Sequence, residues 1–188
     1  MEHFYQDIEG WFSYDYIYKD MVEQAADGDL FVEIGSFKGK SSSFMCVEIA
    51  NSGKNIKFEC IDPQKLLSHY AESAVTQPEV FEGYNVEAFR ERLKSVEQYY
   101  TLRQMTSSDA ASLYEDGSIK FLLVDGDHEP SAVKKDVLDF LPKMKPGGLI
   151  ACDDTFVPEI QRAVEEAAEQ FGFTAESNGI HTFIQIPD

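Results

Sequence analysis

The stretch LFVEIGSFKGKS, residues 30–41, decides the fold. It runs from an apolar segment through a turn with two glycines, Gly35 and Gly39, into a helix-like segment at 40–51. Glycine is needed where the backbone takes a positive φ or where a Cβ would collide with a neighbour. The pattern predicts a strand, a tight turn and a helix, with the turn open to close approach by a ligand. A plain strand-to-helix connection is the alternative.

The glycine spacing of this turn departs from two common nucleotide-binding motifs. Gly35 and Gly39 are four positions apart, so the turn does not match the dinucleotide fingerprint GxGxxG. The gap is also too short for the phosphate loop GxxxxGK[ST]. The choice between a ligand-binding turn and an ordinary connection therefore depends on the rest of the chain.

Strand-like and helix-like segments alternate outward from this stretch. We predict strands at 30–35, 56–61, 101–106, 119–124, 149–152, 173–176 and 181–186. We predict helices at 13–26, 40–51, 86–99, 109–114, from 130 onward and at 158–171, and a turn at 145–148. Such alternation indicates a three-layer, doubly wound α/β fold with a mainly parallel seven-stranded sheet. Asn178-Gly179 favours a tight turn, so the last two strands are expected to form an antiparallel hairpin.

The expected organisation is an N-terminal helical segment at 1–29 followed by one domain at 30–188. Within that domain, residues 63–85 form an insert with no clear period. Loops of that length are often functional.

The composition is strongly acidic, and this limits the classes of partner. The 188 residues carry a formal net charge of −18. Nucleic-acid binding depends on Lys and Arg that neutralise phosphates, so no nucleic-acid partner is expected. The N-terminus lacks the features of a signal peptide and no apolar run has membrane-spanning length, so a cytoplasmic protein without a membrane partner is expected. The oligomeric state is open, with a homodimer as one expectation.

Acidic residues follow several of the predicted strands. Ligands of an open parallel sheet bind beyond the carboxyl ends of its strands. Asp62 follows the second strand and is a candidate to bind ribose hydroxyls, with a turn-forming aspartate before Pro63 as the alternative. Asp125 follows the fourth strand, and Asp153 and Asp154 follow the fifth.

We expect these last three carboxylates to gather at one place, because their strands are neighbours in such a sheet. Clustered carboxylates repel unless a cation or protons compensate, and an all-oxygen set suits Mg²⁺. Alternatively, Asp153 and Asp154 cap the next helix and solvate a loop. His128 lies beside the cluster and is a candidate general base, with a structural histidine as the equal alternative.

Two strings give the chain a more specific resemblance. VEIGSFKGKSS resembles the first S-adenosylmethionine (SAM)-binding motif of class I methyltransferases. FLLVDGDHEPSAVKKDVLDFLPKMKPGGLIACDD resembles the signature of macrocin-type sugar O-methyltransferases and, more distantly, of catechol and caffeoyl-CoA O-methyltransferases. The resemblance implies methyl transfer from SAM to a hydroxyl of a small-molecule acceptor, and the insert would then contribute to the acceptor site.

The resemblance also implies roles for individual residues. Glu33 and Ser41 would hold the methionine end of SAM, and Asp62 would bind the ribose. The full cofactor set, close in sequence to the ends of predicted strands, is Glu33, Gly35, Ser36, Gly39, Ser41, Asp62, Ser107, Ser108, Asp109 and Asp125. Ser107 to Asp109 would lie along the adenine.

For the acceptor side, the resemblance implies that Asp125, Asp153 and Asp154 are metal ligands and that Asp125 and His128 are catalytic. This chain departs from the catechol-type pattern, which has Asp-Asn at the last two positions and a lysine where this chain has His128. The proton acceptor is therefore expected to be His128.

Three other functions are compatible with the sequence. A hydroxylase-like relative would share the fold and perform another reaction, and a SAM-binding module would bind without turnover. A nucleotide-linked oxidoreductase is the third, although the missing GxGxxG argues against it.

Overall fold

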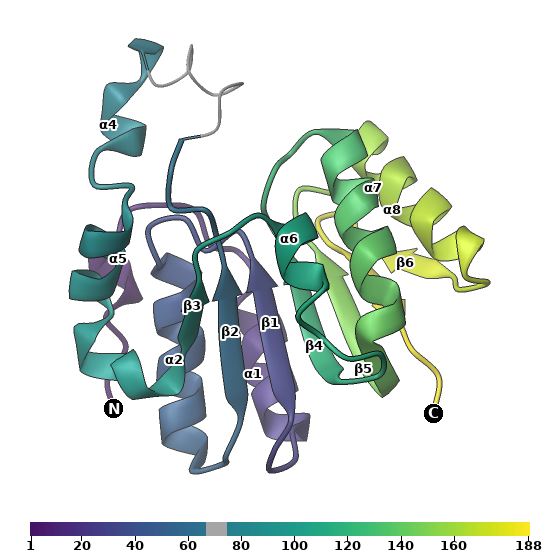
Figure 1. Ribbon diagram of the computed structural model, residues 1–188, viewed down its shortest axis with the longest axis horizontal. Helices are drawn as coiled ribbons and strands as arrows, with labels where there is room; N and C mark the ends of the chain where they lie inside the picture. Colours follow the sequence, from purple (N-terminus) through teal and green to yellow (C-terminus); the bar gives the residue numbers. More distant parts are fainter. Residues whose placement is uncertain (67–74) are drawn as a thin grey trace.

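The strand predicted from the opening stretch lies near the centre of a seven-stranded sheet. The structure is a computed structural model and describes residues 1–66 and 75–188. Among these residues the strand order is β3-β2-β1-β4-β5-β7-β6. The first five strands are mutually parallel, whereas β7 runs antiparallel to both β5 and β6. The predicted mainly parallel sheet with a C-terminal antiparallel hairpin is confirmed (Figure 1).

The bounds of the elements follow the predicted alternation. The strands are β1 Leu30–Ile34, β2 Lys57–Ile61, β3 Thr101–Arg103, β4 Ile119–Val124, β5 Met144–Cys152, β6 Ala175–Ser177 and β7 Thr182–Gln185. The described α-helices are α1 Asp15–Gln24, α2 Lys40–Ser52, α4 Pro78–Phe81, α5 Val86–Arg92, α6 Ser107–Ala111, α7 Pro130–Phe140 and α8 Pro158–Gln170. Short 3-10 turns lie at Tyr5–Asp7, Lys94–Tyr99 and Leu141–Lys143. None of the helices within the described ranges combines the length and apolarity needed to cross a membrane.

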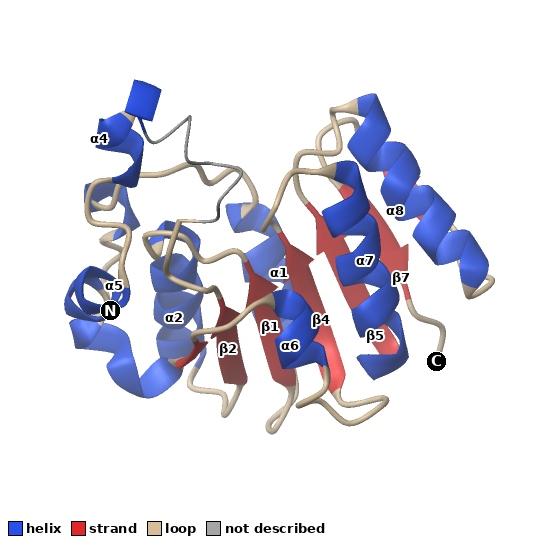
Figure 2. Ribbon diagram, turned by 45° about the horizontal axis from the view of Figure 1, so that its top comes forward, coloured by secondary structure: helices blue, strands red, loops and turns tan. Residues whose placement is uncertain are grey.

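Helices cover both faces of the sheet. Successive side chains of a strand point to opposite faces. Phe31 therefore packs in the core beneath α1 and α2, whereas its neighbour Val32 packs in the core beneath α7 and α8. Figure 2 shows α6, α7 and α8 in front of the sheet and α1 and α2 behind it. Because α1 contributes Ile17 and Tyr18 to the first core, the N-terminal helical segment packs into the same body as residues 30–188.

The chain reverses its direction of travel across the sheet at β1. It passes from β1 to β2 and β3 on one side, and then crosses to β4 on the other. This switch point is where ligands bind in open α/β sheets. Gly35 lies there with φ +90°, and a Cβ on it would lie 1.8 Å from the carbonyl oxygen of Asp125. The close approach predicted for this glycine is made to the main chain after β4.

Three local predictions need correction. Residues 145–148 were predicted as a turn, but they belong to β5 as a bulge, because Ile119 pairs with Met144 while Phe121 pairs with Leu149. The helix predicted at 86–99 ends at Arg92 and continues as a 3-10 turn. The helix predicted at 109–114 begins at Ser107, because the side chain of Thr106 caps it by accepting from the backbone N–H of Asp109.

Candidate active site

A cavity of about 690 Å³ opens beyond the carboxyl ends of the parallel strands. This volume lies within the range of small-molecule and cofactor sites. Its wall combines turns after β1, β2, β3, β4 and β5 with an N-terminal segment, and includes residues 9–11, 34–38, 40–41, 61–63, 106–108, 125–128 and 153–154. Several predicted site residues therefore do meet at one cavity.

Backbone strain concentrates in these turns. Apart from glycine, positive φ occurs among the described residues at Phe37 (+44°), Gln64 (+52°) and Asp154 (+57°). Phe37 and Asp154 line the cavity, and Gln64 lies between two lining residues, Pro63 and Lys65. Such conformations persist only where surrounding contacts impose them, and they cluster at functional sites.

Glu33 lies behind the cavity wall and does not face the cavity itself. Its carboxylate is fully buried and accepts hydrogen bonds from four hydroxyls, those of Tyr18, Ser36, Ser41 and Ser42. Burial raises the pKa of Glu33 to about 7, although these hydroxyls oppose the shift. In this structure Glu33 thus holds Ser36 and Ser41, which do line the cavity. A direct contact between Glu33 and the cofactor, which the resemblance implied, stays a prediction.

Asp62 faces the cavity from the end of β2. Its side chain is 3% exposed, and burial raises the pKa of its carboxyl above the ordinary value. Oδ1 accepts from the backbone N–H of Gln64 at 2.7 Å and from the hydroxyl of Tyr84 at 2.8 Å, while Oδ2 accepts from the backbone N–H of Phe37 at 2.8 Å. A carboxylate offers about four acceptor positions, so these bonds leave room for about one further donor at Oδ2.

Some of the other predicted cofactor residues line the cavity, and others do not. Ser107 and Ser108 line the cavity, whereas Asp109 and Gly39 are not among the lining residues. Gly39 is instead required by its φ of +93° at the start of α2. Asp136, which was missed from the sequence, also lines the cavity and accepts from the Ser107 hydroxyl at 2.5 Å. Burial raises the pKa of Asp136 to about 6.

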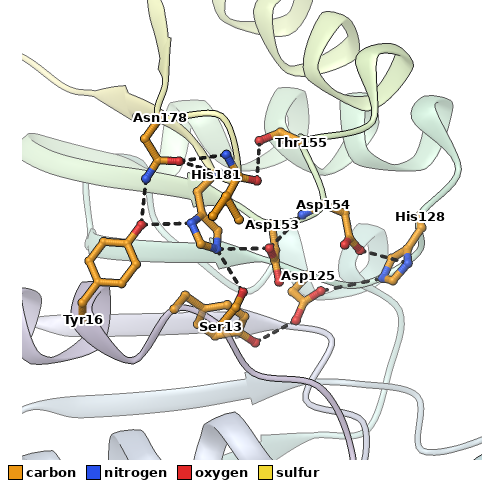
Figure 3. A network of polar contacts seen from close by, with 11 residues as sticks. Ser13, Tyr16, Asp125, His128, Asp153, Asp154, Thr155, Asn178 and His181 are labelled. Carbon is orange, nitrogen blue, oxygen red and sulfur yellow. Dashed lines mark hydrogen bonds and ion pairs between the residues drawn. The ribbon is translucent and has the colours of Figure 1, made fainter.

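The ends of β4 and β5 carry a cluster of Asp125, His128 and Asp154 (Figure 3). His128 Nδ1 lies 3.0 Å from Asp154 Oδ2, and His128 Nε2 lies 3.7 Å from Asp125 Oδ1. Tyr14 donates its hydroxyl to Asp125 Oδ2 at 2.7 Å, a contact that the sequence did not reveal. Burial raises the pKa of Asp125 to about 6. The side chain of His128 is 55% exposed, so this imidazole is open to a ligand.

Asp153 lines the same cavity, and its carboxylate also contacts a histidine outside the cluster. Its Oδ1 lies 3.1 Å from Nε2 of His181, a buried histidine. The three ligand atoms that converge, all within 4.8 Å of one another, come from Asp125, His128 and Asp154. Two carboxylates and one imidazole thus converge here, while the set of Asp125, Asp153 and Asp154 as metal ligands stays a prediction. Residues 67–74 of the predicted insert, which include His69, lie outside the described residues.

The cluster predicts the titration of His128. Asp125 and Asp154 stabilise the protonated imidazole and raise the pKa of His128 above its ordinary value, against the opposing effect of burial. The ring should therefore stay charged to higher pH than an isolated histidine. Substitution Asp154→Asn removes one negative charge and should move the midpoint of a ¹H–¹⁵N NMR titration of His128 to lower pH. Asp127→Asn, in the same loop, is the control, and an equal shift in both variants would argue against specific pairing.

Comparison with known proteins agrees with this fold. Residues 32–155 match a family described as a methyltransferase domain. No curated protein matches the sequence significantly. The family match, together with the sheet order, assigns the protein to the class I SAM-dependent methyltransferases. Since the match covers more than half of the chain, the protein belongs to this methyltransferase-domain family.

Solved structures share the fold at low sequence identity. A candidate caffeoyl-CoA O-methyltransferase from Staphylococcus aureus is 15% identical with a TM-score of 0.64, and the match covers 97% of this chain and 87% of that chain. A SAM-dependent O-methyltransferase from Thermotoga maritima is 10% identical with a TM-score of 0.62, covering 96% and 68%. A candidate rRNA methylase from Clostridium thermocellum is 14% identical with a TM-score of 0.61, covering 96% and 99%. The fold alone therefore leaves the acceptor open.

Proposed function

We propose that the protein transfers the methyl group of SAM to a hydroxyl of a small-molecule acceptor, with His128 as the general base. The observation that carries this proposal is that one cavity contains both Asp62, at the strand end where a ribose binds, and the partly exposed His128 between two carboxylates. Methyl transfer to a hydroxyl requires cofactor alignment and removal of one proton, and these two groups supply both.

The residues around Asp62 fit SAM. The position left at Asp62 Oδ2 suits a ribose hydroxyl, and Ser36, Ser41, Ser107 and Ser108 add hydroxyls along the wall. When bound, SAM supplies a methyl group already activated by its sulfonium. The protein must hold the cofactor and acceptor in line, and the strained turns at the cavity are suited to fixed positioning.

His128 would take the acceptor proton. Nδ1 is engaged with Asp154 at 3.0 Å, whereas Nε2 is 3.7 Å from the nearest oxygen of Asp125 and is the more available nitrogen. Asp125 and Asp154 stabilise the imidazolium that forms when the proton arrives. Tyr14 holds Asp125 in place by donating its hydroxyl to Oδ2, whereas His128 faces Oδ1.

A cation-assisted reaction is the second candidate, because the atoms of Asp125, His128 and Asp154 converge. Mg²⁺ prefers oxygen ligands, so a set that includes an imidazole fits Mn²⁺, Fe²⁺ or Zn²⁺ better. Such a cation would polarise acceptor oxygens. It would also occupy the nitrogen that a base needs, so the two candidates are alternatives. Activity that survives EDTA favours the base, and activity restored only by a divalent cation favours the second candidate.

Cofactor binding is tested first with S-adenosylhomocysteine (SAH) by isothermal titration calorimetry. Asp62→Asn keeps the shape of the side chain but removes its charge and one acceptor oxygen. It should weaken SAH binding by about 10-fold to 100-fold, the range for a hydrogen bond to a charged group. Glu176→Gln, on exposed β6, is the matched control and should bind like wild type. Equal affinity of Asp62→Asn and wild type would remove Asp62 from the cofactor site.

The reaction itself is tested with methyl-labelled SAM and a pool of small hydroxyl compounds that includes catechol and hexoses. Mass spectrometry should locate the label on an acceptor oxygen. Label on nitrogen or carbon would contradict hydroxyl transfer, and SAH binding with no labelled product from the pool would favour a SAM-binding module.

A further inference from the structure

His181 is a buried histidine that joins the N-terminal segment to the C-terminal hairpin. It is 1% exposed and lies just before β7. Its Nδ1 lies 2.9 Å from the hydroxyl of Tyr16, and its Nε2 lies 3.1 Å from Asp153 Oδ1 and 3.3 Å from Ser13 Oγ. Figure 3 shows the imidazole between these three side chains. The proposed reaction assigns no role to this group.

The hydrogen-bond donors around His181 determine which ring nitrogen carries the proton when the ring is neutral. Asn178 donates its side-chain N–H to the hydroxyl of Tyr16 at 2.9 Å. The single proton of that hydroxyl is then available for Nδ1 of His181, so the proton of a neutral ring lies on Nε2 and faces Asp153. Asp153 Oδ1 also accepts from the backbone N–H of Asp154 at 2.8 Å. The chain of bonds therefore runs from β6–β7 through α1 to the end of β5.

The same contacts argue against a nucleophilic triad of Ser13, His181 and Asp153. In such a triad the serine and the carboxylate bind opposite nitrogens of the imidazole. Here both lie against Nε2. The arrangement is suited to holding segments together.

The segment held in this way leads directly into the cavity wall. Residues 9–11 line the cavity. Ser13 follows them just before α1, and Tyr16 lies in the first turn of α1. At its other side the segment contacts the turn after β1, where Lys38 Nζ lies 2.5 Å from Glu9 Oε2 and the ring of Trp11 stacks on Phe37 at 6.4 Å. Trp11 is nevertheless 77% exposed, so little packing holds it.

We propose that His181 is a positioning residue that fastens the start of α1 to the end of β5 and so holds residues 9–11 in place as a wall of the ligand cavity. Its effect on ligand binding rests on the proposed function, whereas its effect on the position of Trp11 does not.

Trp11 reports on this wall directly, because it is the single tryptophan of the chain. The double substitution Ser13→Ala and Tyr16→Phe removes both hydroxyls from His181 at two exposed positions, so the core is left intact. Its tryptophan fluorescence anisotropy should fall below that of wild type, and its dissociation constant for SAH should rise about fivefold, the effect of about one neutral hydrogen bond. Tyr99→Phe, remote from His181, is the control and should match wild type in both measurements. His181→Gln, which keeps one donor and one acceptor, should give intermediate values.

The outcomes separate the two proposals. Unchanged anisotropy in the double variant would overturn the positioning role, because residues 9–11 would then be held without His181. Lower anisotropy with unchanged SAH affinity would overturn the claim that this wall bears on the ligand. If wild type fails to bind SAH and the double variant still loses anisotropy, the proposed function fails while the fastening of residues 9–11 is supported.

Discussion

Substitution His128→Gln should lower kcat for methyl transfer by about 10²-fold to 10⁴-fold, the usual contribution of a general base. Glutamine keeps a polar side chain of similar reach but cannot accept a proton at neutral pH. Because His128 lies at the ends of β4 and β5, away from Asp62 at the end of β2, SAH affinity should stay close to that of wild type. The measurement is steady-state kinetics together with calorimetry of SAH.

His3→Gln is the matched control, because His3 also contacts a carboxylate, that of Glu48 at 2.7 Å. It lies outside the cavity wall and should leave kcat unchanged. A kcat for His128→Gln within about threefold of wild type is far below the usual contribution of a general base and would rule out this role. It would then favour the cation or another proton acceptor.

Substitution Glu33→Ala should lower the free energy of unfolding by about 3–5 kcal/mol, because it leaves several buried hydroxyls without their acceptor. Removing the carboxylate should also disturb the cavity wall, because Ser36 and Ser41 line the cavity and donate hydrogen bonds to Glu33. Urea unfolding followed by circular dichroism measures it. A loss below about 1 kcal/mol would show that the hydroxyls find other partners.

Glu33→Gln tests the charge of this group separately. Burial raises the pKa of Glu33 in the folded protein to about 7, from the ordinary glutamate value of 4.5 that applies in the unfolded chain. A carboxyl with a raised folded pKa stabilises the fold below pH 4.5, and this stability is lost as pH rises to 7. The difference corresponds to about 3 kcal/mol. The stability of Glu33→Gln relative to wild type should therefore improve by about that amount between acidic and slightly alkaline pH, and a constant difference would contradict the raised pKa.

Much of the fold follows from local patterns. The near-continuous apolar run at Ile119–Val124 indicates a strand buried on both faces, and it is one. The turn after β1 was recognisable from Gly35 and Gly39, because few residues other than glycine readily adopt a positive φ. Once the strands were assumed parallel, the positions of Asp62 and Asp125 at one edge followed from topology.

The direction of individual side chains could not be predicted in this way. Asp153 turns toward His181 because residues far away in the sequence, Ser13 and Tyr16, complete that histidine's environment. Glu33 faces the hydroxyls of α2 instead of the cavity. It lies on β1, near the centre of the sheet, where its carboxylate is fully buried. The bulge in β5 depends on pairing with β4, which local sequence does not encode.

The contact between Tyr16 and His181 has a consequence for synthesis of the protein, because it spans 165 positions in the chain. At about 5–20 residues per second, the N-terminal segment leaves the ribosome on the order of 10 s before its partner is made. During that interval Tyr16 lacks both partners of its hydroxyl, His181 and Asn178. A nascent chain that stalls before the hairpin would therefore lack the bond between Tyr16 and His181, so this contact can form only when synthesis is nearly complete.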